Sequence, residues 1–173
     1  MRKNLVLLGM MAVGKTTLAK IVAKKQGLEF IDIDKNIEKK NAMQIKDIFN
    51  IKGEIFFRNE EEKEVLKSLK KNNCVIALGG GAFLNKKLQK IILKETVSIW
   101  LDASIDLICK RCKKSNQRPL LNKKNNNKNL RKIIKDLLKK RKPVYSKAKF
   151  IVKTNEKPFK VCNKILICIK NLV

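Results

Sequence analysis

The stretch that most constrains this chain runs from Gly9 to Thr16 and reads G-M-M-A-V-G-K-T, the spacing of a phosphate-binding P-loop. An apolar run at 5–8 precedes it and a helical pattern begins near Lys15, as a strand, a turn and a helix require. Gly9 and Gly14 let backbone N–H groups turn toward a phosphate, while Lys15 supplies a cation and Thr16 a hydroxyl for magnesium. The chain is therefore predicted to bind a nucleoside triphosphate. A glycine turn with nothing bound is the weaker alternative, because the motif and both flanks are complete.

Length and composition favour a single compact α/β domain over residues 1–173, because 173 residues are too few for two ordinary domains. The 44% hydrophobic content excludes a disordered chain, and no apolar run approaches the roughly 18 residues of a membrane span. The first predicted strand begins almost at Met1, which leaves no room for a targeting segment. We therefore expect a cytoplasmic monomer with no membrane partner.

The net charge of +27 raises the question of nucleic-acid binding, since Lys and Arg neutralise phosphates. Only six of the 42 basic residues are Arg, the lysines are spread over every segment, and aromatic residues make up just 5%. This pattern is more typical of compositional drift than of a surface that stacks bases. We expect nonspecific binding to polyanions at low salt, and no specific nucleic-acid partner.

Five cysteines, an odd number, indicate reduced thiols in a chain with no recognisable secretory signal. Cys109 and Cys112 form a C-x-x-C, but there is no second pair and the chain contains no His to complete a zinc site. We interpret them as two cysteines on one helix face.

Two carboxylates mark the end of the second predicted strand, 28–34, where Asp32 and Asp34 lie two residues apart. If the backbone stays extended, both side chains lean toward one face at the strand's carboxyl end, where open α/β sheets bind ligands. The alternative is a turn-forming pair of solvated aspartates. The third predicted strand, 74–81, ends in three glycines instead of an acid, so Asp32 is the expected organiser of magnesium, and the glycines would expose backbone N–H groups to a substrate.

A long charged helix is predicted from Gly53, with Glu54, Arg58 and Glu61 spaced to pair along one face. A surface ladder of ion pairs is one explanation. Arg58 is nevertheless one of few arginines in a lysine-dominated chain, and bidentate contact with a carboxylate is what Lys cannot imitate. We expect the helical region 34–60 to bind substrate.

The second half of the chain continues the alternation of strands and helices. A polar segment at 113–127 contains Arg118 beside a proline and two leucines, and we predict that it forms a lid. A helix at 130–141 is expected to stop at Pro143. Strands alternating with helices predict a parallel, doubly wound sheet.

Taken together, these motifs resemble the shikimate kinase family over essentially the whole chain. The resemblance rests on GMMAVGKT, FIDID, GEIFFRNEE, ALGGG, RPLL, RKPVY and TNEKP in this order. It implies a P-loop NTPase fold of the nucleoside-monophosphate-kinase-like type, with about five parallel strands, helices on both faces and the P-loop strand central. The implied activity is ATP-dependent phosphorylation of the 3-hydroxyl of shikimate, with Mg²⁺, in chorismate biosynthesis.

The resemblance also implies residue roles. Lys15, Asp34 and Arg118 would be catalytic, with Asp34 orienting the acceptor hydroxyl, and Thr16 and Asp32 would place the metal. The implied nucleotide contacts are Gly9, Ala12, Val13, Gly14, Lys15, Thr16, Thr17, Arg111, Arg118, Asn155 and Pro158. The implied shikimate contacts are Asp34, Arg58, Gly79, Gly80, Gly81 and Arg141. Four of the six arginines thus fall on implied site positions.

The chain departs from the family pattern at a few positions. Ala12 and Ile33 stand where the family usually has glycine and a small polar residue, and a usual glycine near Ala42 is missing. Ala12 is tolerable there only if its φ is negative, so it is the first position at which we look for backbone strain. Two alternatives remain open, another small-metabolite kinase of this fold such as a gluconate kinase, and a basic polyanion-binding protein that retains the fold.

Overall fold

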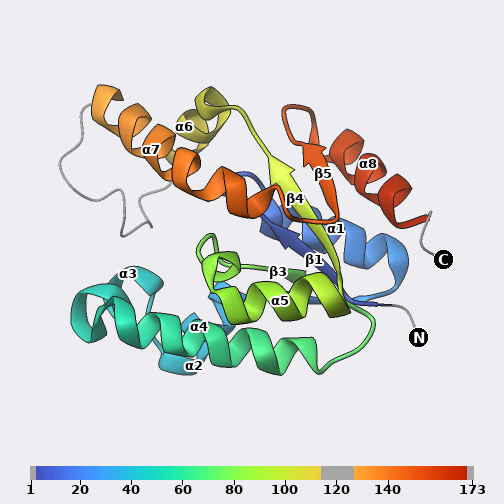
Figure 1. Cartoon of the computed structure of the whole chain (residues 1–173), viewed down its shortest axis with the longest axis horizontal. Helices are drawn as coiled ribbons and strands as arrows, with labels where there is room; N and C mark the ends of the chain where they lie inside the picture. The colour runs from blue at the N-terminus through green and yellow to red at the C-terminus, as the bar shows by residue number, and fades with distance from the viewer. Residues whose placement is uncertain (1–2, 114–126, 171–173) are drawn as a thin grey trace.

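The computed structural model describes residues 3–113 and 127–170, and it centres on one parallel sheet. The strand order is β2-β3-β1-β4-β5, so the strand that leads into the phosphate loop lies in the middle (Figure 1). The strands are β1 (Leu5–Leu8), β2 (Glu29–Asp32), β3 (Cys74–Ala77), β4 (Val97–Asp102) and β5 (Phe150–Lys153). The predicted five-stranded parallel sheet is confirmed.

Helices cover both faces of this sheet, with α1 packed against α8 on one face and α4 against α5 on the other (Figure 1). The helices are α1 (Lys15–Gln26), α2 (Ile33–Asn41), α3 (Ile45–Asp47), α4 (Gly53–Leu69), α5 (Lys86–Glu95), α6 (Ile105–Lys113), α7 (Asn127–Tyr145) and α8 (Pro158–Lys170). A short π-helix (Ile48–Lys52) joins α3 to α4, and a 3-10 turn (Ala82–Leu84) precedes α5. None of the helices in the described ranges is long and apolar enough to cross a membrane.

The central strands consist of continuous apolar residues because helices shield them from water on both sides. All four residues of β1 are at most 3% exposed, and β3 is equally buried. The resulting rigid sheet holds the loops at its carboxyl edge in fixed positions.

The second strand ends two residues earlier than predicted, because Asp32 caps a helix. Its Oδ1 accepts a hydrogen bond from Lys35 N at 3.1 Å, and α2 begins at Ile33. Asp34 therefore lies in the first helical turn and not in extended backbone, so the prediction of a strand through Asp34 is wrong.

The prediction that Pro143 ends a helix at Arg141 is also wrong, since α7 continues to Tyr145. A proline inside a helix removes the hydrogen bond to the carbonyl four residues earlier and crowds that carbonyl, so the turn after Pro143 needs other contacts to hold it. Tyr145 is 1% exposed and its ring lies 6.0 Å from that of Trp100. This burial holds the last turn in place.

Cys109 and Cys112 lie on one helix, α6, as predicted from their spacing. Cys112 is buried in the core and Cys109 is partly buried, both as free thiols. Their neighbours within the described residues include no cluster of three or more His, Cys, Asp or Glu side chains suited to a metal ion.

Candidate active site

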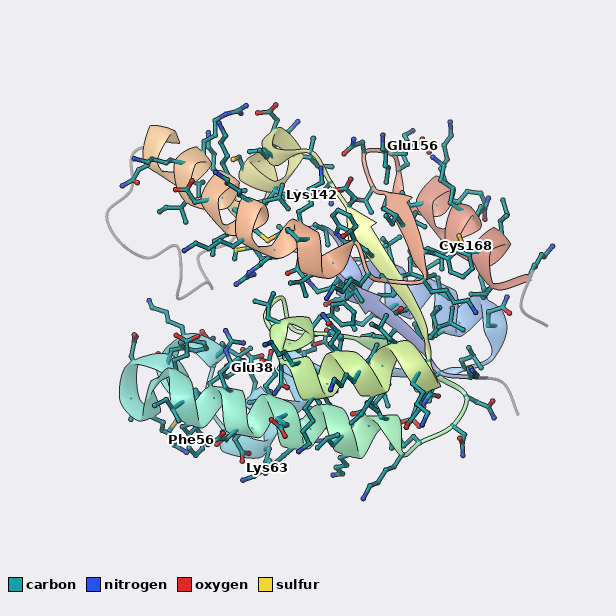
Figure 2. The ribbon with its side chains drawn as sticks, in the orientation of Figure 1. Glu38, Phe56, Lys63, Lys142, Glu156 and Cys168 are labelled. Carbon is teal, nitrogen blue, oxygen red and sulfur yellow. The ribbon has the colours of Figure 1, made fainter. Side chains whose placement is uncertain are left out.

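One cavity of about 650 Å³ opens at the carboxyl edge of the sheet. The phosphate loop, α2, α4, the segment after β3 and the start of α8 all contribute to its walls. Figure 2 labels two lining residues, Glu38 on α2 and Glu156 between β5 and α8, which are well separated in the view. Since Glu38 follows β2 and Glu156 follows β5, the two edge strands, the cavity extends across the carboxyl edge of the sheet.

Most of the predicted site residues meet in this cavity. Those that line it are Ala12, Val13, Gly14, Lys15, Thr16, Thr17, Asp32, Asp34, Arg58, Gly80, Gly81, Arg111, Arg141 and Pro158. Gly9, Gly79 and Asn155 are not among the lining residues. Arg118 and nearly all of the predicted lid lie outside the described residues.

The phosphate loop is closed by its own lysine. Lys15 Nζ donates to Gly9 O at 3.0 Å and to Met10 O at 2.8 Å, so the ammonium lies inside the turn. Gly9 has φ 138°, and a Cβ there would lie 2.6 Å from Leu101 O, so only glycine fits against β4. Gly9 thus shapes the loop without lining the cavity.

Ala12 has φ 60°, so it does not adopt the negative φ that would make an alanine tolerable, and the loop is strained at this position. Left-handed backbone is unfavourable for a residue with a Cβ, and such strain persists only where surrounding contacts hold it. Ala12 lies two residues before Gly14, which is the N-cap of α1 and is itself left-handed.

Thr16 and Asp32 form a pair of oxygen donors at the start of α1. Thr16 Oγ1 donates to Asp32 Oδ2 at 2.7 Å, and Asp32 is buried. A hydroxyl with one carboxylate fits Mg²⁺, which keeps several waters and takes further oxygens from phosphates.

Asp34 faces the cavity from the first turn of α2 and is partly buried. Burial raises the pKa of its carboxyl from 3.8 to about 7. Lys15 opposes this shift, whereas the carboxylates of Glu61, Asp32 and Glu38 add to it. A group with such a pKa can take or give a proton near neutral pH.

Arg58 projects from α4 between two carboxylates, as predicted from their spacing. Its Nη1 donates to Glu61 Oε2 at 2.7 Å, and Nη2 lies 3.2 Å from Glu54 Oε1. The Glu61 side chain is only 3% exposed whereas that of Glu54 is 59% exposed. The ladder is therefore not a surface feature throughout: one end is fixed deep beside the cavity.

Arg141 reaches the same cavity from α7 and is 6% exposed. Its Nη1 donates to Gly80 O at 3.2 Å, and Tyr145 donates its hydroxyl to the same oxygen at 2.5 Å. Two donors from one helix thus fix the peptide after β3. Arg58 and Arg141 provide two cations at one end of the cavity.

The three glycines after β3 leave room for side chains. A Cβ on Gly79 would lie 2.7 Å from Asp34 Oδ1 and closer still to Glu61 Oε1, and one on Gly81 would overlap the Arg58 guanidinium. Gly79 is thus packed beneath the two carboxyls, which explains why it does not line the cavity. Gly80 and Gly81 do line it.

The far end of the cavity lies between α6 and α8. Arg111 Nη1 donates to Ala12 O and Val13 O, both at 3.1 Å, and Pro158 begins α8. Asn155 instead turns toward α6, where its Oδ1 accepts from Ser104 N at 3.1 Å. The sequence did not reveal this hydrogen bond, because it joins residues far apart in the chain.

Glu61 and Tyr145 are absent from the predicted site, although both support residues in it. Glu61 Oε1 is buried and has no hydrogen-bond partner within the described part of the chain. Burial raises the pKa of Glu61, and Arg58 opposes this shift. The sequence signal for both is helical spacing, since Glu61 lies three residues after Arg58 and Tyr145 lies four residues after Arg141.

A P-loop at a central strand, facing an acceptor pocket with a carboxylate and two arginines, defines a small-molecule kinase of the P-loop class. The shikimate kinase family model matches residues 11–170, and the chain belongs to this family. A shikimate kinase from Persephonella marina is 39% identical over 165 residues, covering 95% of this chain and 97% of the relative. One from Thermodesulfovibrio yellowstonii is 42% identical, covering 95% and 93%.

Among solved structures, the shikimate kinase from Acinetobacter baumannii in complex with shikimate superposes with a TM-score of 0.92. It is 31% identical in sequence, and the match covers 98% of this chain and 94% of that one. The predicted family and the assignment as a kinase are thus confirmed.

Proposed function

We propose that this chain transfers the γ-phosphoryl group of ATP to the 3-hydroxyl of shikimate, giving shikimate 3-phosphate and ADP. The observation that carries the proposal is the cavity that joins the phosphate loop to Asp34, Arg58 and Arg141. The two cations, Arg58 and Arg141, suit a carboxylate on the ligand. The Asp34 carboxyl suits the ligand hydroxyl that accepts the phosphoryl group. The related Acinetobacter baumannii kinase was solved in complex with shikimate.

Arg58 and Arg141 bind the shikimate carboxylate in this proposal. Planar guanidinium groups make paired hydrogen bonds to a carboxylate, which fixes the acceptor's orientation as well as its position. Glu61 holds Arg58 through the 2.7 Å ion pair, so the arginine is oriented before substrate arrives. Backbone N–H groups at Gly80 and Gly81 add contacts to the same ligand.

Asp34 hydrogen-bonds the 3-hydroxyl and accepts its proton as the hydroxyl attacks. With no His in the chain, a carboxylate is the natural base, and a pKa of about 7 suits proton transfer near neutral pH. Orientation of the hydroxyl toward the γ-phosphate accounts for much of the rate enhancement.

The phosphate loop amides and Lys15 bind the β- and γ-phosphates, so Lys15 must exchange its bonds to Gly9 O and Met10 O for phosphate oxygens. Thr16 and Asp32 would hold Mg²⁺, which neutralises charge on the transferring phosphoryl group. Arg111 and Pro158 border the adenine. The role of Arg118 in stabilising the transferring group stays a prediction.

The decisive experiment is an ADP-release assay on the purified chain with ATP and Mg²⁺, offering shikimate and gluconate separately. We expect turnover with shikimate and a background rate with gluconate. Turnover of gluconate alone would instead favour the rival small-metabolite kinase. We also propose that the protein is a monomer located in the cytoplasm. Light scattering on the purified protein tests the monomeric state.

A further inference from the structure

Ala12 is the strained point of the phosphate loop. Its φ of 60° places an alanine where its Cβ is unfavourable, and the flanking residues Val13 and Gly14 lead directly into α1. Left alone, an alanine in this position relaxes toward negative φ, and the loop amides then lose their common direction. Some contact from outside the loop must therefore favour the strained conformation.

Arg111 supplies such a contact from α6. Its Nη1 donates to the carbonyls of both Ala12 and Val13 at 3.1 Å, although 99 residues separate Arg111 from Ala12 in the chain. The guanidinium lies over the loop, since a Cβ on Gly14 would be 3.7 Å from the same nitrogen. A charged donor shared by consecutive carbonyls holds the peptide planes on either side of Val13.

The hydrogen bonds of Arg111 go to backbone carbonyls of the loop, which leaves the loop amides to bind phosphate. In a loop that binds an anion, the amide N–H groups turn inward, and carbonyls on the outer side need donors of their own. Arg111 provides a donor to two such carbonyls, those of Ala12 and Val13, from outside the loop. Lys15 bonds Gly9 O and Met10 O from inside the turn and exchanges these bonds for phosphate oxygens, so the contact of Arg111 is the one that can persist with nucleotide bound.

We propose that Arg111 is a positioning residue that holds the phosphate loop in its nucleotide-binding shape by offsetting the strain of the left-handed Ala12. This rests on the proposed function in assuming that the loop binds ATP. It assigns Arg111 a role separate from any contact with the adenine. The strain at Ala12 makes the role testable, because glycine at that position adopts positive φ without cost.

The test is a double-mutant cycle on the full chain, with Kd for Mg-ADP measured by calorimetry. Arg111→Met keeps an aliphatic stem and removes the donors. We expect it to weaken ADP about tenfold with Ala12 present, and about threefold or less in the Ala12→Gly background. The KM for shikimate should change less than twofold in both backgrounds, since Arg111 bonds the loop at Ala12 and Val13, whereas Arg141 contacts it at Met10.

Arg131→Met is the matched control, because Arg131 is an exposed arginine of α7 that pairs with Asp106 of α6, the helix that carries Arg111. We expect its ADP affinity to equal that of the unmodified chain. Amide hydrogen exchange without nucleotide gives a second readout: Arg111→Met should speed exchange at residues 13–15, and Ala12→Gly should reverse part of that change.

Equal losses of ADP affinity in the two backgrounds would overturn the proposal, because Arg111 would then act only through the nucleotide. No loss in either background would also overturn it. Since the readout is ADP binding, a chain that binds ADP but fails to phosphorylate shikimate would contradict the proposed function alone.

Discussion

Asp34 combines a function with a cost to stability. Its carboxyl is surrounded by Glu61, Asp32 and Glu38, and burial holds its pKa near 7. Since this value lies above the ordinary 3.8, ionisation destabilises the folded protein. The destabilisation is absent below about pH 4, grows as the pH rises toward the folded-state pKa of about 7, and is complete above it.

Asp34→Asn should therefore abolish shikimate turnover while it raises the stability of the ligand-free protein. We expect a gain on the order of 1–3 kcal/mol in the free energy of unfolding at pH 8, and almost none at pH 4, where both side chains are neutral. Urea titrations at the two pH values measure the difference. ADP affinity should be largely kept. A loss of stability at pH 8 would show that the carboxylate is better solvated than its surroundings indicate.

Arg58→Lys should weaken shikimate far more than ATP, because an ammonium cannot reproduce paired contacts to a carboxylate. We expect KM for shikimate to rise at least tenfold, about 1.4 kcal/mol, with KM for ATP nearly unchanged. Glu54→Gln is a matched comparison, since it removes the exposed partner of Arg58 and leaves the buried ion pair with Glu61 intact. If both changes raised KM for shikimate equally, Arg58 would not be a ligand of the shikimate carboxylate.

At the scale of elements, the last turn of α7 fixes the segment that follows β3. Tyr145 and Arg141 both donate to Gly80 O, and the turn persists beyond Pro143 because Tyr145 is buried. Burial raises the pKa of the Tyr145 hydroxyl, so it stays a donor at neutral pH. The helix thus aligns one clamp arginine and one glycine peptide together.

Tyr145→Phe should accordingly raise KM for shikimate about three- to tenfold, through loss of one hydrogen bond worth about 1 kcal/mol, and leave KM for ATP unchanged. Thr96→Val provides the control, because Thr96 is also buried and donates its hydroxyl to a carbonyl, Ile92 O, at 2.7 Å. It should cost similar stability without affecting shikimate. If KM for ATP rose equally in Tyr145→Phe, the effect would be general loosening of the fold.

At the scale of the whole molecule, the charge of +27 should act as a diffuse attraction for polyanions. We expect binding to a random RNA or DNA to fall by at least 100-fold between about 50 and 200 mM salt, while shikimate turnover falls much less. Fluorescence anisotropy with a labelled oligonucleotide and the kinase assay in the same buffers compare the two. Tight, sequence-selective binding at 200 mM salt without turnover would favour the polyanion-binding alternative.

Local sequence patterns predicted the first three strands of the sheet and most of the site, because their signals lie within short segments. The phosphate loop is a contiguous motif, and the Arg58 to Glu61 pair follows from helical spacing. The errors lie at element ends. The pattern of apolar residues predicts a strand through Asp34. It contains no signal for the hydrogen bond from Lys35 N to Asp32, which ends the strand and begins α2.

By itself, the sequence determined the fold class, the phosphate loop and the family, since each depends on residue type at fixed spacing. Only the tertiary structure brought Glu61 and Asp34 together over Gly79, and joined Arg111 to Ala12. These contacts connect segments far apart in the chain, and they depend on which faces of the helices meet. The same distant contact with Arg111 explains how the loop accommodates a left-handed alanine.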